Sequence, residues 1–245
     1  MIDLVVNADD FGYSEEVNSA IVESANQGLL SSTTLMVNMP GFDDAVMRIK
    51  NGELKDKIRV GLHLNLFEGV PLSEGMKKCK VFCDGNGIYH EQAISFSAPR
   101  KIIGTIVTTE LDEQIKKILS AGIVPSHLDS HAHRHTNWFI GSAVMKLAKK
   151  YGIPEIRQNG NIGHRKIKSK ILIMLYNTRL GKFRKTDFFG NIPEMTELLK
   201  TCNTGVAEIM CHPGYYHGEI LDREFKLPLA DMLTPLLKST NKVIF

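Results

Sequence analysis

Histidine and aspartate side chains recur at alternate positions in one short run of this 245-residue chain. The run is Ser126-His-Leu-Asp-Ser-His-Ala-His-Arg-His135, and the alternate positions are His127, Asp129, His131, His133 and His135. In an extended strand alternate side chains share one face, so the run predicts a single surface lined with nitrogen and oxygen ligands. Like-facing residues lie about 6.6 Å apart along a strand. One metal ion therefore takes one or two of these groups, and its other ligands must come from elsewhere.

Further polar residues stand where short apolar runs end. They are Asp9 and Asp10 after Leu4 to Asn7, His63 inside Gly61-Leu-His-Leu-Asn65, Arg157 at the end of Glu155 to Arg157, and His212 after Ile209-Met-Cys211. Adjacent carboxylates repel each other but point in different directions, so one can bind an ion while the other remains a base. An arginine can hold a carboxylate through two parallel hydrogen bonds. Together these residues predict a catalytic metal site, although each alone could be a turn, a core histidine or an ordinary ion pair.

The elements that must position these residues alternate between strands and helices. We expect strands at Leu4 to Asn7, Thr33 to Val37, Arg59 to Asn65, Ser126 to Asp129, Glu155 to Arg157, Asp187 to Phe189, Ala207 to Met210 and Lys242 to Ile244. Amphipathic helices are expected at Glu16 to Gln27, Phe42 to Lys50, Glu110 to Ala121, Ser142 to Tyr151, Lys166 to Arg179 and Pro193 to Thr201. This order predicts an irregular (β/α) barrel of seven or eight parallel strands. The polar residues then share the carboxyl-end face, where barrel enzymes build their sites.

Length and composition favour one domain over residues 1–245. The segment from about 67 to 100 is rich in glycine and shows no convincing element. Loops of that length in compact domains usually have a function, so we expect a lid or a substrate wall there.

Charge and cysteine usage exclude several classes of protein. The chain has 30 basic and 27 acidic residues, a balance that argues against nucleic acid or an anionic membrane as a main partner. It shows neither a signal peptide at Met1 nor a membrane-spanning run. Four scattered cysteines favour reduced thiols and a cytoplasmic location. A homodimer is the default expectation for oligomeric state.

A basic run from Arg165 to Lys185 contains no acidic residue. Half of it has the pattern of an amphipathic helix, so a solvated helix face is favoured over nucleic-acid binding. If the substrate carries phosphate, one or two of these cations would be expected to hold it.

Several motifs, in order along the chain, resemble the YdjC/ChbG family of carbohydrate deacetylases. They are Asn7-Ala-Asp-Asp-Phe-Gly-Tyr-Ser14, Ser32-Thr-Thr34 with Val37-Asn38, Gly61-Leu-His-Leu64, His127-Leu-Asp-Ser-His131 and Met210-Cys-His-Pro213. The resemblance implies a barrel of the NodB, or glycoside hydrolase/deacetylase, type. It also implies a divalent ion bound by Asp10, His63 and His131, with Asp9 as general base. The implied substrates are N-acetylated sugars, with chitobiose-type oligosaccharides of chitin degradation among them.

The chemistry of these residues suits amide hydrolysis. An Asp-His-His set leaves open positions on an ion, which acidifies bound water. Asp9 can then take the water proton, and His212 can protonate the leaving amine. His127, Asp129, His133 and Arg157 are candidates to orient the ligands, the base or the substrate. Mixed nitrogen and oxygen ligands favour zinc, manganese or cobalt, whereas the resemblance implies magnesium, and no organic cofactor is expected.

Two alternatives to sugar deacetylation stay open at this stage. His131-Ala-His133 also resembles the His-x-His of other metal-dependent amidohydrolases, although that motif belongs on a first strand. A non-catalytic carbohydrate-binding or regulatory protein could retain the same site. The intact Asp9-Asp10 pair argues against a decayed enzyme.

Overall fold

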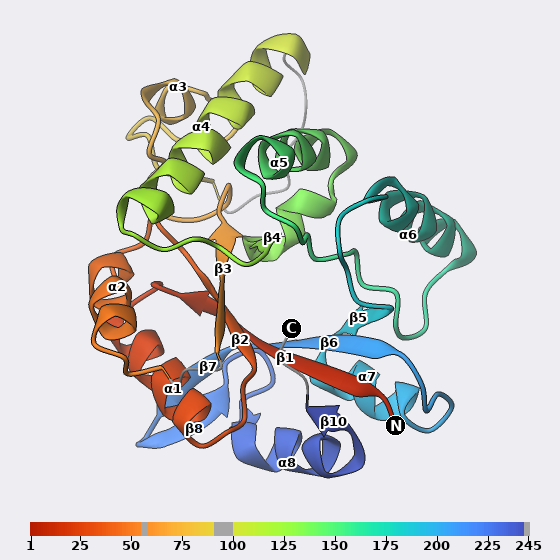
Figure 1. Cartoon of the computed structure of the whole chain (residues 1–245). Helices are drawn as coiled ribbons and strands as arrows, with labels where there is room; N and C mark the ends of the chain where they lie inside the picture. Colours follow the sequence, from red (N-terminus) through yellow and green to blue (C-terminus); the bar gives the residue numbers. More distant parts are fainter. Residues whose placement is uncertain (55–57, 91–99, 243–245) are drawn as a thin grey trace.

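The structure is a computed structural model that describes residues 1–54, 58–90 and 100–242. Its central sheet is a curved layer of parallel strands with helices around the outside (Figure 1). The strands run in the order β4-β3-β2-β1-β6-β5, and β10 pairs with the start of β1. They are β1 (Asp3–Phe11), β2 (Ser32–Leu35), β3 (Arg59–Leu64), β4 (Leu128–Ser130), β5 (Phe188–Gly190), β6 (Val206–Cys211) and β10 (Asn241–Lys242). The predicted irregular parallel barrel is confirmed by this architecture.

The helices that cover the sheet mostly lie between successive strands. They are α1 (Glu15–Asn26), α2 (Phe42–Lys50), α3 (Glu74–Lys77), α4 (Arg100–Ser120), α5 (Trp138–Tyr151), α6 (Ile167–Arg179), α7 (Ile192–Leu198) and α8 (Leu229–Ser239). No helix of the described residues is long and apolar enough to cross a membrane.

The two faces of β1 explain how this fold builds a site. Leu4 and Val6 belong to the hydrophobic core. Asn7 and Asp9 alternate with that apolar set and are also buried, but they hydrogen-bond to other strands and to Arg157. Because alternate side chains of a strand point to opposite faces, one face packs against helices while the other is polar. The polar face leads to the carboxyl ends of the strands.

One expected strand and two helix boundaries are wrong. Glu155 to Arg157 forms no regular strand, because the segment makes isolated bridges to Leu128 and Arg184 and then leaves the sheet. Helix α4 begins ten residues before the predicted Glu110. The run Thr105-Ile-Val-Thr-Thr109 is poor in helix formers, so the sequence gives no sign that α4 begins before it. Helix α5 begins at Trp138, because the Asn137 side chain caps its first turn.

The chain after His212 contains elements that the sequence patterns did not indicate. An antiparallel sheet forms from β7 (Pro213–Tyr216), β8 (Glu219–Asp222) and β9 (Leu227–Pro228), and α8 follows it. Strand β7 packs against α1, where the Tyr215 hydroxyl donates to Glu23. The expected strand at Lys242 to Ile244 is present at Lys242, and its last two residues lie outside the described part.

The segment expected to be a long loop has some regular structure. Helix α3 lies within it, and Cys83 forms an isolated bridge with Tyr89. Residues 91–99 are outside the described part of the chain. The start of the segment, at Phe67 and Glu68, reaches the polar face of the barrel through contacts with His131. Its role as a lid or substrate wall stays a prediction.

Candidate active site

A cavity of about 380 Å³ opens at the carboxyl ends of β1, β3, β4 and β6. It brings together residues that are far apart in the sequence, as predicted for the carboxyl-end face of a barrel. The cavity is lined by Asp9, Asp10, His63, Ser130, His131, Ala132, His133, Met210, His212, Arg223 and Glu224.

Three side chains converge on one point of this cavity with the chemistry of a metal site. Asp10 Oδ1 lies 2.9 Å from His131 Nδ1 and 3.3 Å from His63 Nε2. One ligand atom from each residue falls within 4.8 Å of the others. Asp10 has a φ of 69°, a left-handed conformation that aspartate tolerates better than most residues. This turn aims Asp10 toward the histidines, whereas Asp9 before it points to Arg157.

His63 is oriented by a buried carboxylate. Asp129 Oδ1 lies 2.7 Å from His63 Nδ1, and the Thr34 hydroxyl donates to Asp129 Oδ2. With Nδ1 held by Asp129, Nε2 faces Asp10, which is the carboxylate-histidine arrangement found behind metal ligands. Burial lowers the pKa of His63, but the charge of Asp129 and the hydrogen bonds outweigh burial and raise the pKa to about 10.

Asp9 belongs to a separate, buried ion-pair cluster next to Asp10, His63 and His131. Arg157 Nη1 and Nη2 donate to the two oxygens of Asp9 at 2.7 and 2.8 Å. The same guanidinium lies 2.7 Å from Asp129 and, through Nε, donates to Glu208 at 2.6 Å. Burial alone would raise the pKa of Asp9, but the charge and hydrogen bonds of Arg157 hold it well below its usual range. Asp9, His63 and Asp129 also lie close enough to bind an ion, yet Arg157 already supplies their positive charge.

The histidine run does not line one face as its alternation predicts. Strand β4 ends at Ser130, and residues His131–Thr136 form a 3₁₀ helix with Ala132 and His133 in the left-handed region. Of the run's four histidines, His131 contacts Asp10. His133 packs against Phe189, and burial lowers its pKa to about 4.

The other two histidines of the run are buried away from the three converging ligands. His135 hydrogen-bonds to the Ser130 hydroxyl and to the Arg157 carbonyl. His127 bonds to its neighbour Ser126 and packs over Gly61, where an added Cβ would lie 2.5 Å from the ring. Both have a pKa lowered by burial, to about 3 and about 4 respectively.

His212 lines the cavity directly after β6. Its amide donates to Asp222 Oδ2, and its carbonyl accepts from the Arg223 amide, so the antiparallel sheet fixes its backbone. Its side chain is less constrained. His212 Nδ1 lies 3.7 Å from Glu224 Oε2 and has no hydrogen-bond partner in the described part of the protein. The ring can therefore turn toward a ligand in the cavity.

Three charged residues that line the cavity or contact His131 were not predicted from the sequence. Glu68 lies 3.3 Å from His131 Nε2 and also accepts from the Tyr13 hydroxyl. Arg223 donates to Asp10 Oδ2, and Glu224 stands beside it at the rim. Glu68 follows β3 by four residues, which is a positional signal that could have been used. Arg223 and Glu224 come from the turn between β8 and β9, which no local pattern indicated.

The architecture and the site define a class of protein. A parallel α/β barrel with aspartate and histidine side chains converging at its carboxyl-end face is an arrangement typical of hydrolases. The sequence profile of the YdjC-like protein family matches residues 3–236, and this chain belongs to that family. The family predicted from the motifs is thereby confirmed.

Curated relatives agree with this assignment. A carbohydrate deacetylase of Clostridium beijerinckii is 35% identical over 98% of this chain and 92% of its own length. One of Halalkalibacterium halodurans is 34% identical over 94% of both chains. The prediction of an enzyme of the carbohydrate deacetylase class agrees with these relatives.

A solved structure from Enterococcus faecalis has the same fold. This candidate cellobiose-phosphate cleavage protein superposes with a TM-score of 0.76, covering 99% of this chain and 97% of its own, at 23% identity.

Proposed function

We propose that this chain is a metal-dependent hydrolase that removes the acetyl group from N-acetylated sugars. The observation that carries the proposal is the convergence of Asp10, His63 and His131 beside Asp9 in one open cavity. The carbohydrate deacetylase activity named for the relatives supports the reaction class. Hydrolysis of an acetamido group needs a polarised carbonyl, a deprotonated water and a proton for the departing amine.

The three converging residues fit a divalent ion. One carboxylate oxygen and two imidazole nitrogens are a donor set common in catalytic sites that keep open positions. When bound, such an ion polarises the acetamido carbonyl and acidifies water. Asp10, His63 and His131 would hold it, and Asp129 would keep His63 in the required tautomer. On the chemistry of these donors we propose zinc, manganese or cobalt as the ion. The family resemblance implies magnesium instead.

We propose Asp9 as the general base. Asp9 Oδ2 accepts one hydrogen bond, from Arg157 Nη1, so a second lone pair is free for a water proton. Because Arg157 lowers the pKa of Asp9, the carboxylate is ionised throughout the neutral range. Arg157 also fixes the direction of both oxygens. The low pKa makes Asp9 a weak base, suited to a water that is already acidified.

We propose that His212 protonates the departing amine. It directly follows β6, which lies on the opposite side of β1 from β2 and β3, and it lines the same cavity as Asp9 and Asp10. A proton donor separate from the base allows attack and departure to occur on two sides of the tetrahedral carbon. Glu224, 3.7 Å from His212 Nδ1, would hold the ring once it carries a proton.

The proposed substrates are N-acetylated mono- and oligosaccharides, with chitobiose-type sugars among them. The cavity of about 380 Å³ suits one or two sugar rings, since sites for small ligands measure roughly 300–1,000 Å³. Arg223 at the rim can donate to sugar hydroxyls or to an acidic substituent. Arg223 also donates a hydrogen bond to Asp10, one of the proposed metal ligands.

Acetate release from N,N′-diacetylchitobiose, measured after each divalent ion is added back to chelated protein, tests the proposal. Asp9→Asn should keep stoichiometric metal while losing roughly 10²- to 10⁴-fold in rate, the usual contribution of a general base. Asp10→Asn and His63→Ala should lose the metal itself. Full metal content in Asp10→Asn and His63→Ala would show that the ligands are elsewhere.

Two further results separate the proposal from its alternatives. Binding of acetylated sugar without acetate release by metal-loaded protein would favour a carbohydrate-binding protein. Hydrolysis of a simple cyclic amide in preference to acetylated sugar would favour another amidohydrolase. His164→Ala is a matched control, because this exposed histidine lies outside the cavity and should keep full metal content and rate.

A further inference from the structure

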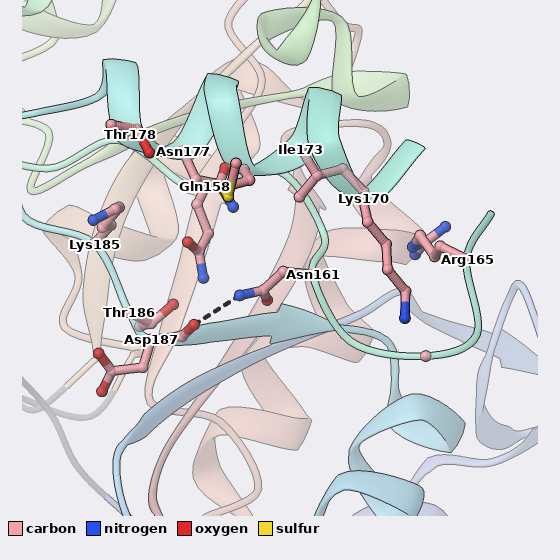
Figure 2. A pocket seen from close by; sticks show the side chains of 12 residues that line it. Gln158, Asn161, Arg165, Lys170, Ile173, Asn177, Thr178, Lys185, Thr186 and Asp187 are labelled. Carbon is pink, nitrogen blue, oxygen red and sulfur yellow. Dashed lines mark hydrogen bonds between the residues drawn. The ribbon is translucent and has the colours of Figure 1, made fainter. Parts of the chain in front are cut away.

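A second cavity, of about 550 Å³, lies between α6 and the chain segment that leads into β5. Figure 2 shows its side chains coming from α6 on one side, from the loop after Arg157 on another, and from Lys185 to Asp187 on a third. The cavity shares no lining residue with the proposed active site. The volume falls within the roughly 300–1,000 Å³ of small-molecule sites.

The lining of this cavity is rich in hydrogen-bond donors and positive charge. Three cations and three amides contribute, namely Arg165, Lys170, Lys185, Gln158, Asn161 and Asn177. Arg165 pairs with Glu194 at 3.0 Å, whereas Lys170 and Lys185 make no ion pair within the described residues. The lining also contains one acidic residue, Asp187. Its Oδ2 accepts a hydrogen bond from the Val206 amide, which partly compensates its negative charge.

Gln158 gives an independent indication of a ligand. The residue is 2% exposed, and its Nε2 has no hydrogen-bond partner in the described structure. A buried amide donor without an acceptor costs about 1–3 kcal/mol, so such groups are rare unless something else satisfies them. Asn161 and Asn177 differ, since both already bond to the backbone of this region. The unsatisfied donor lines the same cavity as Lys170 and Lys185.

We infer that this cavity is a binding site for a phosphate group, either free or carried by a small phosphorylated molecule. A phosphate offers several acceptor oxygens and up to two negative charges, which match the free Gln158 donor and the two unpaired lysines. Gln158 follows Arg157 directly, and Arg157 points to the opposite side of the chain, toward Asp9. Neighbouring residues of one segment thus contact the proposed base, through Arg157, and line the proposed anion site, through Gln158.

Isothermal titration calorimetry of the full chain with inorganic phosphate, glucose 6-phosphate and glucose tests this inference. Both anions should saturate at one site per chain, and glucose should not bind. Lys170→Gln/Lys185→Gln should weaken binding at least about tenfold, as expected for losing charge-assisted hydrogen bonds. Gln158→Leu should weaken it by a smaller factor while preserving the buried volume. Lys168→Gln, exposed on the same helix but outside the cavity lining, is the matched charge control.

Several results would overturn the inference. These are absence of saturable phosphate binding, an equal loss in Lys168→Gln and the double variant, and binding of glucose as tight as that of its phosphate. Binding that disappears in His131→Ala yet persists in the double variant would belong to the metal site instead. Tighter binding of glucose 6-phosphate than of inorganic phosphate supports a phosphorylated ligand, and equal affinities support a site for the free anion. These readouts do not depend on deacetylation.

Discussion

The proposed active site has an inner half and an outer half that are built differently. Asp9, Asp129 and Arg157 are fully buried, come from the sheet or its immediate continuation, and satisfy one another. Glu68 and Arg223 come from connecting segments, and their side chains are 24% and 33% exposed. Charges in the inner half interact at low effective dielectric, whereas water screens those of the outer half. The inner half should therefore control the stability of the fold and the ionisation of the proposed base. The outer half should control how substrate and metal ion bind and leave.

The sharpest test of this comparison places the same substitution in each half. Arg157→Gln removes the positive charge from three buried carboxylates, so the free energy of unfolding should fall by about 3–5 kcal/mol. Arg223→Gln removes one partly exposed ion pair and should cost less than about 1 kcal/mol. Urea denaturation of both variants measures the difference. Equal losses would show that burial does not separate the two halves.

A second prediction concerns the pH dependence of the inner half. Burial raises the pKa of Glu208 from 4.5 to about 7 against the opposing charge of Arg157. The folded state then binds the proton more tightly than the unfolded state, so stability is full below pH 4.5 and falls as the pH rises to about 7. Glu208→Gln retains an acceptor for Arg157 and should remove this loss, which amounts to at most about 3 kcal/mol. Denaturation at pH 5 and pH 8 measures it, and parallel pH profiles for the two proteins would contradict it.

A third prediction compares the two carboxylates that stand behind the proposed histidine ligands. Asp129→Asn should weaken metal binding roughly 10- to 100-fold, because Asp129 orients His63 in a buried site. Glu68→Gln should weaken metal binding less than about tenfold, because its contact with His131 is 3.3 Å long and partly exposed. Competition with a chelating dye gives both constants. A larger effect from Glu68 would identify it as a direct ligand.

The smallest expected effect concerns backbone strain in the outer half. Ala132 has a φ of 49°, which costs an L-residue roughly 1–2 kcal/mol relative to glycine. Ala132→Gly should therefore stabilise the protein, by at most about 1 kcal/mol after the entropic cost of glycine. Ala143→Gly, in the regular helix α5, should destabilise it by a similar amount. Thermal unfolding of the two variants should show shifts of opposite sign.

The sequence predicted the inner half better than the outer half for a physical reason. Asp9, His63 and Asp129 follow or lie in apolar strands, and parallel strands necessarily bring their carboxyl ends to one face. Arg223 depends on an antiparallel sheet formed from short strands that lack clear alternation. The prediction that the histidine run lines one face was wrong, because side chains alternate between faces only while the backbone is extended. Ala132 and His133 adopt the left-handed conformation and end the extended stretch. Local patterns therefore located the strand ends but not the turns that complete the cavity.

The pairing of β1 has a consequence for how the protein is synthesised. Strand β1 is made before the other strands of its sheet, yet one edge pairs with β6, and Asp10 contacts Arg223, 213 residues later. At translation rates of about 5–20 residues per second, that edge waits roughly 10 to 40 s for its partner. Its sequence Leu4-Val-Val6 is apolar and β-prone, which makes an unpaired edge prone to aggregation. Yield on expression should therefore depend on temperature and chaperone supply more than the stability of the finished fold suggests.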